Sequence, residues 1–191
     1  MAYGNRFKSA ELSGTSTSEV YATEQYPFGS TYVQPSDEVP AVTIEGVVVS
    51  NSGVGTATAN FALLRGDRVW IFIQASANIP AGACVMRSSN TNPYIGAEND
   101  ADGMTSALLL GVADHAININ QFGWVIARGC CVVESSAGVA AGHNLDTDGN
   151  TGNLGSVDTS AGDTASGNLG RALEAVGAVT AGFVQAYINV L

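Results

Sequence analysis

The stretch LGVADHAININQFGWVIARG, residues 110–129, decides the fold because the chain repeats its pattern of small and apolar residues. A second stretch, LGRALEAVGAVTAGFVQAYI at residues 169–188, follows at a constant offset of 59. The two stretches share these residues: Leu110/Leu169, Gly111/Gly170, Ala113/Ala172, Ala116/Ala175, Gly123/Gly182, Val125/Val184 and Ala127/Ala186. Because like positions in a duplicated spacing should share a structure, we expect both stretches to form the same elements.

The first stretch indicates that these elements are strands. On its own, GRALEAVGAV favours a helix, since Ala, Leu and Glu are good helix formers. Its equivalent GVADHAININ contains Val, Ile, Asn and Asp, which is a poor helix composition. We therefore predict, in each copy, a strand that begins near the glycine, then a turn, then a second strand that starts at Gly123 or Gly182.

A second repeated motif supports a repeat unit of larger size. SANIPAG at residues 76–82 aligns with SAGVAAG at residues 136–142 at an offset of 60, and GAVTAG at residues 177–182 repeats the end once more. In each copy a Val or Ile anchors a loop on the core, and the final Gly permits the positive φ that turns the chain into the next strand. We interpret the repetition as structural: β units of about 60 residues with possible pseudo-symmetry.

The chain divides into two parts by composition. Residues 1–40 lack a sustained period and contain Pro27, Pro35 and Pro40, so we predict an extended N-terminal arm; a loosely packed first hairpin is the alternative. Residues 41–191 show short runs rich in Val, Ile, Phe, Trp and Tyr that are separated by Gly, Asn, Asp and Ser. This pattern is typical of an all-β sandwich or barrel.

Charge restricts the partners. Charged residues make up 13% of the chain and hydrophobic residues 46%, and the net charge is −10. The seven basic residues are scattered, so we expect no nucleic acid as a partner, because phosphate binding needs a concentrated basic face. No apolar run is long enough to span a membrane and no secretory leader is recognisable, so we expect synthesis in the cytoplasm and no membrane partner. A surface this poor in charge is typical of a protein covered by copies of itself or by a lattice.

The reactive side chains do not combine into a catalytic or metal site. Three cysteines, Cys84, Cys130 and Cys131, form a poor disulfide framework, and we interpret them as small buried apolar residues. Asp114 and His115 are neighbours whose side chains point apart on a strand, so they form no dyad. We expect His115 and His143 each to be a lone histidine that is exposed or partly buried, and Trp70 and Trp124 to lie in the core. We predict no catalytic residue, no metal and no cofactor.

The acidic segment at residues 142–170 leaves one alternative open. DTDGN at residues 146–150 invites a calcium interpretation, but an EF-hand loop needs its Gly at the sixth position and a Glu at the twelfth, where this chain has Val157. A turn at Asp-Gly explains the segment better. A host-facing adhesion or carbohydrate-binding module that uses this loop, with or without calcium, is the alternative function.

The two repeated stretches resemble a known family. ALLLGVADHAININQFGWVIARGCCVVESSAGVAAGHNL and NLGRALEAVGAVTAGFVQAYINVL, which together cover about residues 105–191, resemble the head decoration proteins, or capsid cement proteins, of tailed bacteriophages. The stretch DRVWIFIQASANIPAG at residues 67–82 is a weaker echo. The resemblance implies a mostly β protein that docks as a small oligomer, often a trimer, on the outside of the capsid and braces it, and it implies no active site.

Function follows as an expectation from the resemblance and from the sparse charge. We expect a structural decoration protein that binds the major capsid protein on the capsid exterior of a virion and forms a homo-oligomer, with a trimer favoured and a dimer as the alternative. Repeated small contacts over many copies add by avidity. The arm side chains that we expect to contact the capsid or a neighbouring subunit are Arg6, Phe7, Lys8, Tyr21, Tyr26, Phe28 and Tyr32.

Overall fold

The described part of the chain is all β, as predicted. The computed structural model describes residues 17, 19–35, 67–99, 108–135, 139–147, 157–159, 169–173 and 182–191. Among these residues there is no α-helix. In particular, this part of the chain offers no helix of the length and apolarity that crossing a membrane demands.

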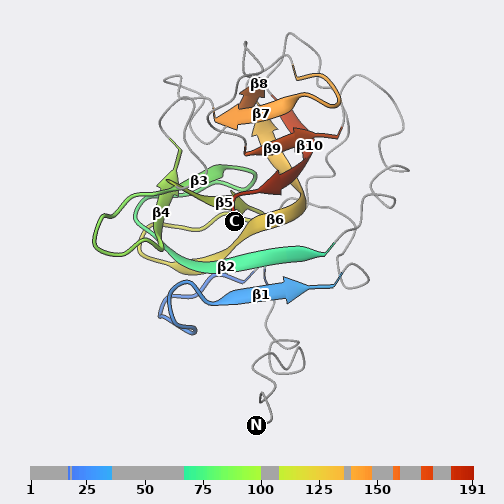
Figure 1. The fold of residues 1–191 in the computed structure, drawn as a ribbon. Helices are drawn as coiled ribbons and strands as arrows, with labels where there is room; N and C mark the ends of the chain where they lie inside the picture. Colours follow the sequence, from blue (N-terminus) through green and yellow to red (C-terminus); the bar gives the residue numbers. More distant parts are fainter. Residues whose placement is uncertain are drawn as a thin grey trace.

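Ten strands join into one sheet system in the described residues (Figure 1). The first six strands along the chain are β1 Thr31–Gln34, β2 Arg68–Ala75, β3 Cys84–Arg87, β4 Ile95–Glu98, β5 Leu109–Ala113 and β6 Phe122–Ser135. Four follow: β7 Asn144–Thr147, β8 Val157–Thr159, β9 Gly170–Ala172 and β10 Gly182–Asn189. The strands predicted at Gly123 and Gly182 are β6 and β10, so that prediction is confirmed.

The pairings close the sheet into two rings. The neighbours β2, β4, β3, β5 and β6 form the first ring, which the additional pairing of β6 with β2 completes. The neighbours β6, β10, β9, β7 and β8 form the second ring, which the pairing of β8 with β6 completes. We call these rings the first barrel and the second barrel.

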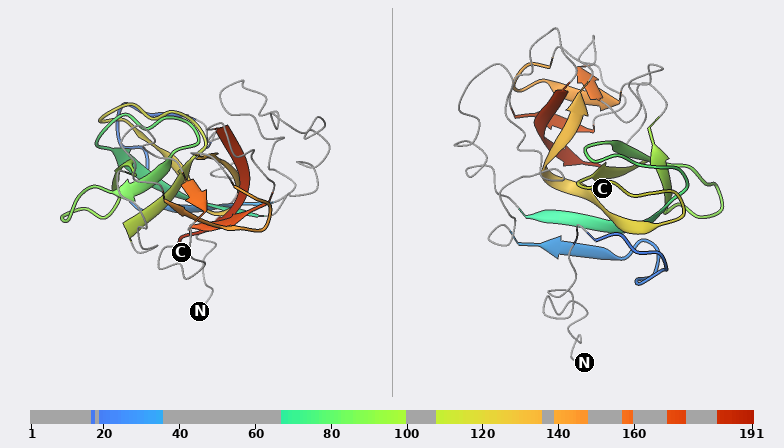
Figure 2. Two further views of the ribbon diagram at one scale, coloured as in Figure 1. Left: turned by 90° about the horizontal axis from the view of Figure 1, so that it is seen from above. Right: turned by 180° about the vertical axis from the view of Figure 1, so that it is seen from behind.

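Strand β6 belongs to both barrels and therefore holds them together. Its first half pairs with β2 through Gln74↔Phe122 to Val69↔Arg128, and its second half pairs with β10 through Asn189↔Arg128 to Gly182↔Ser135. Its 14 residues are rich in Val, Ile, Phe, Trp and Cys, which favour extended backbone. Figure 2 shows β6 running from the β2 layer into the group of β7 to β10.

The barrels repeat one another at the predicted offset. Strand β3, residues 84–87, corresponds to β7, residues 144–147, at an offset of 60. The pair Val85↔Gly111 of the first barrel has its equivalent in Leu145↔Gly170 of the second. The parallel pairing of β2 with β4 likewise corresponds to that of β6 with β8. The predicted β unit of about 60 residues is therefore a barrel, and the duplication is structural.

The shared Leu-Gly of the repeat has a steric reason. A Cβ added to Gly111 would overlap the carbonyl oxygen of Ile126, and a Cβ added to Gly170 would overlap that of Tyr187. Each glycine thus lets a short strand approach the longer strand beside it. The same close approach in both barrels explains why the sequence repeats Gly at this position.

Two apolar clusters form the core. The first contains Ile71, Ile73 and Val125 and belongs to the first barrel. The second joins Trp70, Phe72 and Trp124, on the other face of β2 and β6, to apolar residues of the second barrel such as Val133, Leu145 and Val184. Both tryptophans are 1% exposed, which confirms their prediction as core residues.

Some predicted segments lie outside the described residues. The apolar runs at residues 42–66 do, and so do residues 174–181, which contain the second half of GRALEAVGAV. The predicted boundary between arm and domain, at residues 40 and 41, lies there too. Residues 19–35 of the predicted arm are described, and they pack on the first barrel.

Candidate interaction surface

A strap of N-terminal chain, residues 19–35, crosses the outer face of the first barrel. It begins with a backbone bridge in which Tyr21 and Phe122 each donate an N–H to the other's carbonyl oxygen at 2.9 Å. It ends as β1, which pairs antiparallel with β2 from Thr31↔Ile71 to Gln34↔Arg68. The Gln34 Oε1 also accepts a hydrogen bond from Trp70 Nε1 at 3.0 Å, so a buried indole N–H fixes the end of the strap.

Aromatic rings fill the space between the strap and the barrel. The ring of Tyr26 lies 5.2 Å from the rings of both Phe72 and Trp124, centroid to centroid. Phe28 stacks on Phe122 at 5.9 Å, and Phe122 stacks in turn on Phe72 at 6.1 Å. Edge-to-face and offset pairs at such distances are worth about 0.5–1.5 kcal/mol each beyond the area that they bury. The strap is therefore a packed part of the first barrel.

The exposed face of the strap carries a different set of residues. In β1, Tyr32 and Gln34 point inward at 8% exposure, whereas Thr31 and Val33 point outward, and Val33 is 53% exposed. This alternation is the period of two that a strand with one buried face requires. Two carboxylates of the strap, Glu19 and Glu24, are exposed as well.

One strap side chain has a shifted titration. Partial burial raises the pKa of Tyr21 to about 12, and the hydrogen bond that its hydroxyl donates to Glu19 at 3.1 Å, together with the negative charge of that carboxylate, acts in the same direction. Each of these effects disfavours the phenolate. Tyr21 is therefore neutral at every pH at which the barrel would ordinarily work.

The structure places four of the seven predicted contact residues. Tyr21, Tyr26, Phe28 and Tyr32 come together on the first barrel of their own chain. Their contact with a capsid or a neighbouring subunit stays a prediction. The other three, Arg6, Phe7 and Lys8, lie outside the described residues.

A buried arginine ties the two barrels at their junction. Arg68, at the start of β2, is 2% exposed, and its Nε donates a hydrogen bond to the carbonyl oxygen of Cys130 at 2.8 Å. Its guanidinium lies 5.9 Å from the ring of Trp70. Burial raises the pKa of the nearby Asp114, while the positive charge of Arg68 lowers it. The arginine therefore offsets part of the cost of a buried carboxylate.

Two more carboxylates lie between the barrels. Burial and the negative charge of Glu134 raise the pKa of Glu98, and burial raises that of Glu134. The neighbouring backbone is tightly joined, because the N–H of Glu134 donates to the carbonyl oxygen of Gly82 at 2.8 Å. The ring of Phe183 lies against Gly82 as well. A loop of the first barrel thus contacts the start of β10 in the second.

The structure brings the cysteines and histidines into no common site among the residues that it describes. Cys84 and Cys131 are buried, and desolvation raises the pKa of both thiols, so they are poor nucleophiles. Cys130 is partly exposed, which departs from the prediction that all three are buried. His143 is exposed, as predicted, whereas His115 is buried at 5% exposure, which departs from the prediction. No group of three metal-ligating side chains occurs within the portion of the chain that the structure describes.

The structure also reveals a set of exposed residues that the sequence did not predict. Tyr187 of β10 lies directly opposite Arg171 of β9, and its hydroxyl accepts a hydrogen bond from the Nε of Arg128 of β6 at 3.3 Å. The Nε of Arg171 donates to the carbonyl oxygen of Gly142 at 2.7 Å. We call Arg128, Tyr187 and Arg171 the arginine–tyrosine ladder. Only the strand register brings them together, since 59 residues separate Arg128 from Tyr187.

Comparisons with known proteins give limited similarity. No protein-family model matches the sequence, and no curated protein matches it. Among solved structures, the chain is similar to the head fiber gp8.5 N base of bacteriophage phi29, with 17% sequence identity and a TM-score of 0.46. The match covers 64% of this chain and 95% of that chain. The chain is therefore assigned to no family.

Proposed function

We propose that this chain is a structural decoration protein that binds the outside of a phage head and stabilises the lattice of its major capsid protein. One observation carries the proposal. The stretches whose small-residue spacing resembles decoration proteins form β5, β6, β9 and β10, and they include β6, the strand that both barrels share. The resemblance thus falls on the framework of the fold.

The framework suits a bracing role. Two barrels that share one continuous strand cannot separate without breaking β6 or its pairings with β2 and β10. A body of this kind transmits load between the points at which it touches a shell. Because an assembled lattice binds it and free subunits do not, its binding free energy adds to the stability of the assembly.

The surface also suits a protein that shares contacts with neighbours. Only 13% of the residues are charged, and the strap exposes the apolar Val33 as well as the carboxylates Glu19 and Glu24 at other points along its length. Small contacts of this kind bind weakly one by one. Many identical copies on one shell make the sum of such contacts strong.

One observation counts against the calcium-dependent form of the alternative function. Asp146, the first carboxylate of the DTDGN stretch, lies in β7 at 7% exposure, and one of its carboxylate oxygens accepts the N–H of Thr147 at 2.8 Å. Calcium takes several carboxylate and carbonyl oxygens together. A carboxylate that lies within a strand at 7% exposure is poorly placed to supply the first of them.

The test is binding to heads that lack the protein. Heads of the phage that encodes the chain, prepared without it, are mixed with the full chain and with the triple variant Arg6→Ala, Phe7→Ala, Lys8→Ala. We expect the full chain to co-sediment with the heads, to appear as added density on their outer surface and to raise their temperature of rupture. The triple variant keeps every residue of the strap and should bind less tightly.

A matched control separates the arm from general damage. Ala77 and Asn90 are exposed on the first barrel, so the double variant Ala77→Ser, Asn90→Ser should bind like the unchanged chain. Full chain that neither binds the heads nor changes their rupture temperature contradicts the proposed function. Binding that the triple variant retains in full contradicts only the role of the three arm residues.

A further inference from the structure

The arginine–tyrosine ladder gathers positive charge on the surface of an acidic protein. The side chains of Arg128 and Arg171 are exposed, and Tyr187 between them is 38% exposed. Each arginine uses its Nε in a hydrogen bond within the chain, Arg128 to Tyr187 and Arg171 to Gly142. Each bond engages one N–H of the guanidinium group and fixes its direction, and the pairing of Tyr187 with Arg171 puts both arginines on one face. Such an arrangement is suited to bind carboxylates, because a guanidinium matches their geometry.

The internal repeat identifies the part of the first barrel that corresponds to the ladder surface of the second barrel. The offset of 60 that relates the barrels maps Arg68, at the start of β2, onto Arg128 in β6. The registers agree, since Val69↔Arg128 in the first barrel corresponds to Gly129↔Ile188 in the second. Arg68 is 2% exposed, and its Nε donates a hydrogen bond to Cys130 in the half of β6 that pairs with β10 of the second barrel. Arg128 holds the same place in the second barrel and is exposed.

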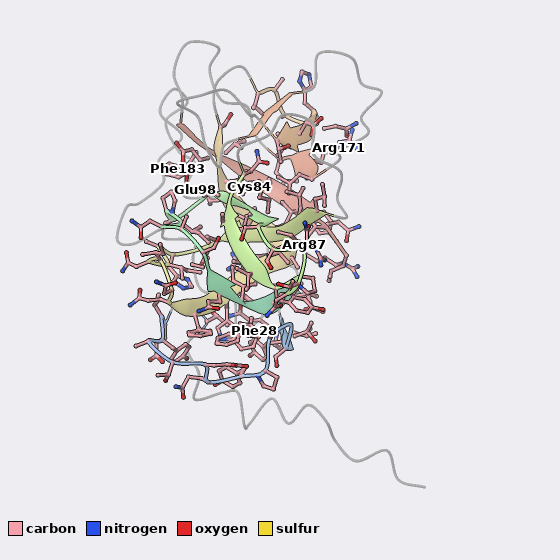
Figure 3. All side chains as sticks on the ribbon, turned by 90° about the vertical axis from the view of Figure 1, so that its left-hand side faces the viewer. Phe28, Cys84, Arg87, Glu98, Arg171 and Phe183 are labelled. Atoms are coloured by element: carbon pink, nitrogen blue, oxygen red, sulfur yellow. The ribbon has the colours of Figure 1, made fainter. Side chains whose placement is uncertain are left out.

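The opposite end of the molecule has a complementary cap. At the start of β10, the ring of Phe183 lies against Gly82 in a loop of the preceding barrel. At the equivalent start of β6, Phe122 is covered by the strap, through the backbone bridge to Tyr21 and the stacked ring of Phe28. The strap thus takes the place of a preceding barrel. Its outer face carries Glu19 and Glu24, both exposed, and Figure 3 shows that Arg171 and Phe28 lie at opposite ends of the molecule.

We propose that the arginine–tyrosine ladder of one molecule binds the strap of a second copy of this chain. If the repeat continued, a third barrel would pack on the ladder surface. The first barrel of a second molecule can take this position, and its strap would then face the ladder. The charges agree, with Arg128 and Arg171 on one side and Glu19 and Glu24 on the other. The two faces differ, so the contact is heterologous and builds a closed ring or an open chain of copies.

Charge reversal tests the contact in the full chain. The ladder variant is Arg128→Glu, Arg171→Glu, and the strap variant is Glu19→Arg, Glu24→Arg. We expect the unchanged chain to self-associate in sedimentation velocity, and each double variant to associate at least about tenfold more weakly, because like charges then face each other. An equimolar mixture of the two variants should associate again, since every ladder then finds a strap of opposite charge.

Controls keep the result specific. The variants Ala77→Glu, Asn90→Glu and Ala77→Arg, Asn90→Arg place the same two charges on another exposed part of the first barrel and should associate like the unchanged chain. The near-ultraviolet circular dichroism of the aromatic cluster reports that each variant is folded. A monomeric unchanged chain at every concentration overturns the proposal. So does association that ladder reversal leaves intact, or a mixture that stays dissociated.

Discussion

Gly82 and Gly142, sixty residues apart, have the same backbone conformation and the same hydrogen bond. Both adopt a φ of +83°, and the N–H of Gly82 donates to the carbonyl oxygen of Ala113 as that of Gly142 donates to Ala172. The surroundings differ. A Cβ at Gly82 would lie 2.6 Å from the ring of Phe183, whereas the nearest atom at Gly142 would be 3.9 Å away, in Arg171. Here the repeat fixes the backbone, and the barrel junction fixes the packing.

This pair gives a prediction with its own control. Gly142→Ala places an L side chain at positive φ in open space and should cost about 1–2 kcal/mol of unfolding free energy. Gly82→Ala carries the same backbone cost and must also displace the Phe183 ring, so it should cost about 2–4 kcal/mol. Urea denaturation of both variants measures the difference. Equal losses would show that the two barrels do not meet at Phe183.

The strap depends on the ring of Tyr26. Tyr26→Ala removes the contacts with Phe72 and Trp124 and should lower the unfolding free energy by about 2 kcal/mol. The fluorescence of Trp124 should shift to longer wavelength, because water reaches the indole. Gln25→Ala, at the neighbouring exposed position, should change neither quantity. Unchanged fluorescence of the Tyr26 variant would mean that the strap does not cover this tryptophan.

Tyr21 predicts a loss of stability at high pH. Its pKa rises from 10.0 to about 12 in the folded chain, so the folded state binds the phenolic proton more tightly than the unfolded state. The resulting stabilisation is complete below pH 10 and is lost as the pH rises toward 12. The variant Tyr21→Phe removes this contribution, and its unfolding midpoint should fall less steeply between pH 10 and 12. Parallel curves for the two proteins would refute the assignment.

The carboxylates between the barrels predict a change of stability on the acidic side of the pH range. The pKa of both Glu98 and Glu134 is raised above 4.5, so the neutral forms are favoured in the folded chain, and this stabilisation is lost as the pH rises through the folded values. Glu134→Gln removes a charge that raises the pKa of Glu98. The variant should therefore be more stable than the unchanged chain at pH 7 and equal to it near pH 3. The exposed substitution Glu24→Gln is the control and should show no such gain.

The thiols should differ in reactivity. In the native chain, a maleimide should label Cys130, which is partly exposed, and leave Cys84 and Cys131 unmodified because both are buried. Intact mass should therefore increase by one label at native conditions and by three labels in denaturant. Cys130→Ser should abolish the native label. Rapid native labelling of either buried thiol would contradict the packing of the barrels.

The sequence predicts the strands, and it does so through particular residues. Gly111 and Gly170 mark the same close approach of a short strand to a longer one, because each meets the same steric demand in its own barrel. Gly123 and Gly182 lie at the starts of β6 and β10. Such demands act over a few residues and leave a pattern in the chain. The packing of Trp70 and Trp124 follows from their place in apolar runs for the same reason.

The candidate surfaces could be predicted only in part. The aromatic residues of the strap stand out in the sequence. The sequence does not show, however, whether Tyr21, Tyr26, Phe28 and Tyr32 pack on their own chain or on another molecule. The structure places them on Phe72, Phe122 and Trp124 of the same chain. The ladder left no local signal, because Arg128, Tyr187 and Arg171 meet only through the register of three strands.

What the sequence by itself determined is the all-β class, the repeat of 60 residues and the positions of the strands that the repeat contains. Each of these depends on side-chain volume and backbone freedom at short range. Only the tertiary structure decided that β6 serves both barrels, that the strap caps the first barrel, and that Arg68 is buried while Arg128 is exposed. The two arginines are equivalent in the repeat, and burial depends on whether another barrel lies over the site, a fact that no local pattern records.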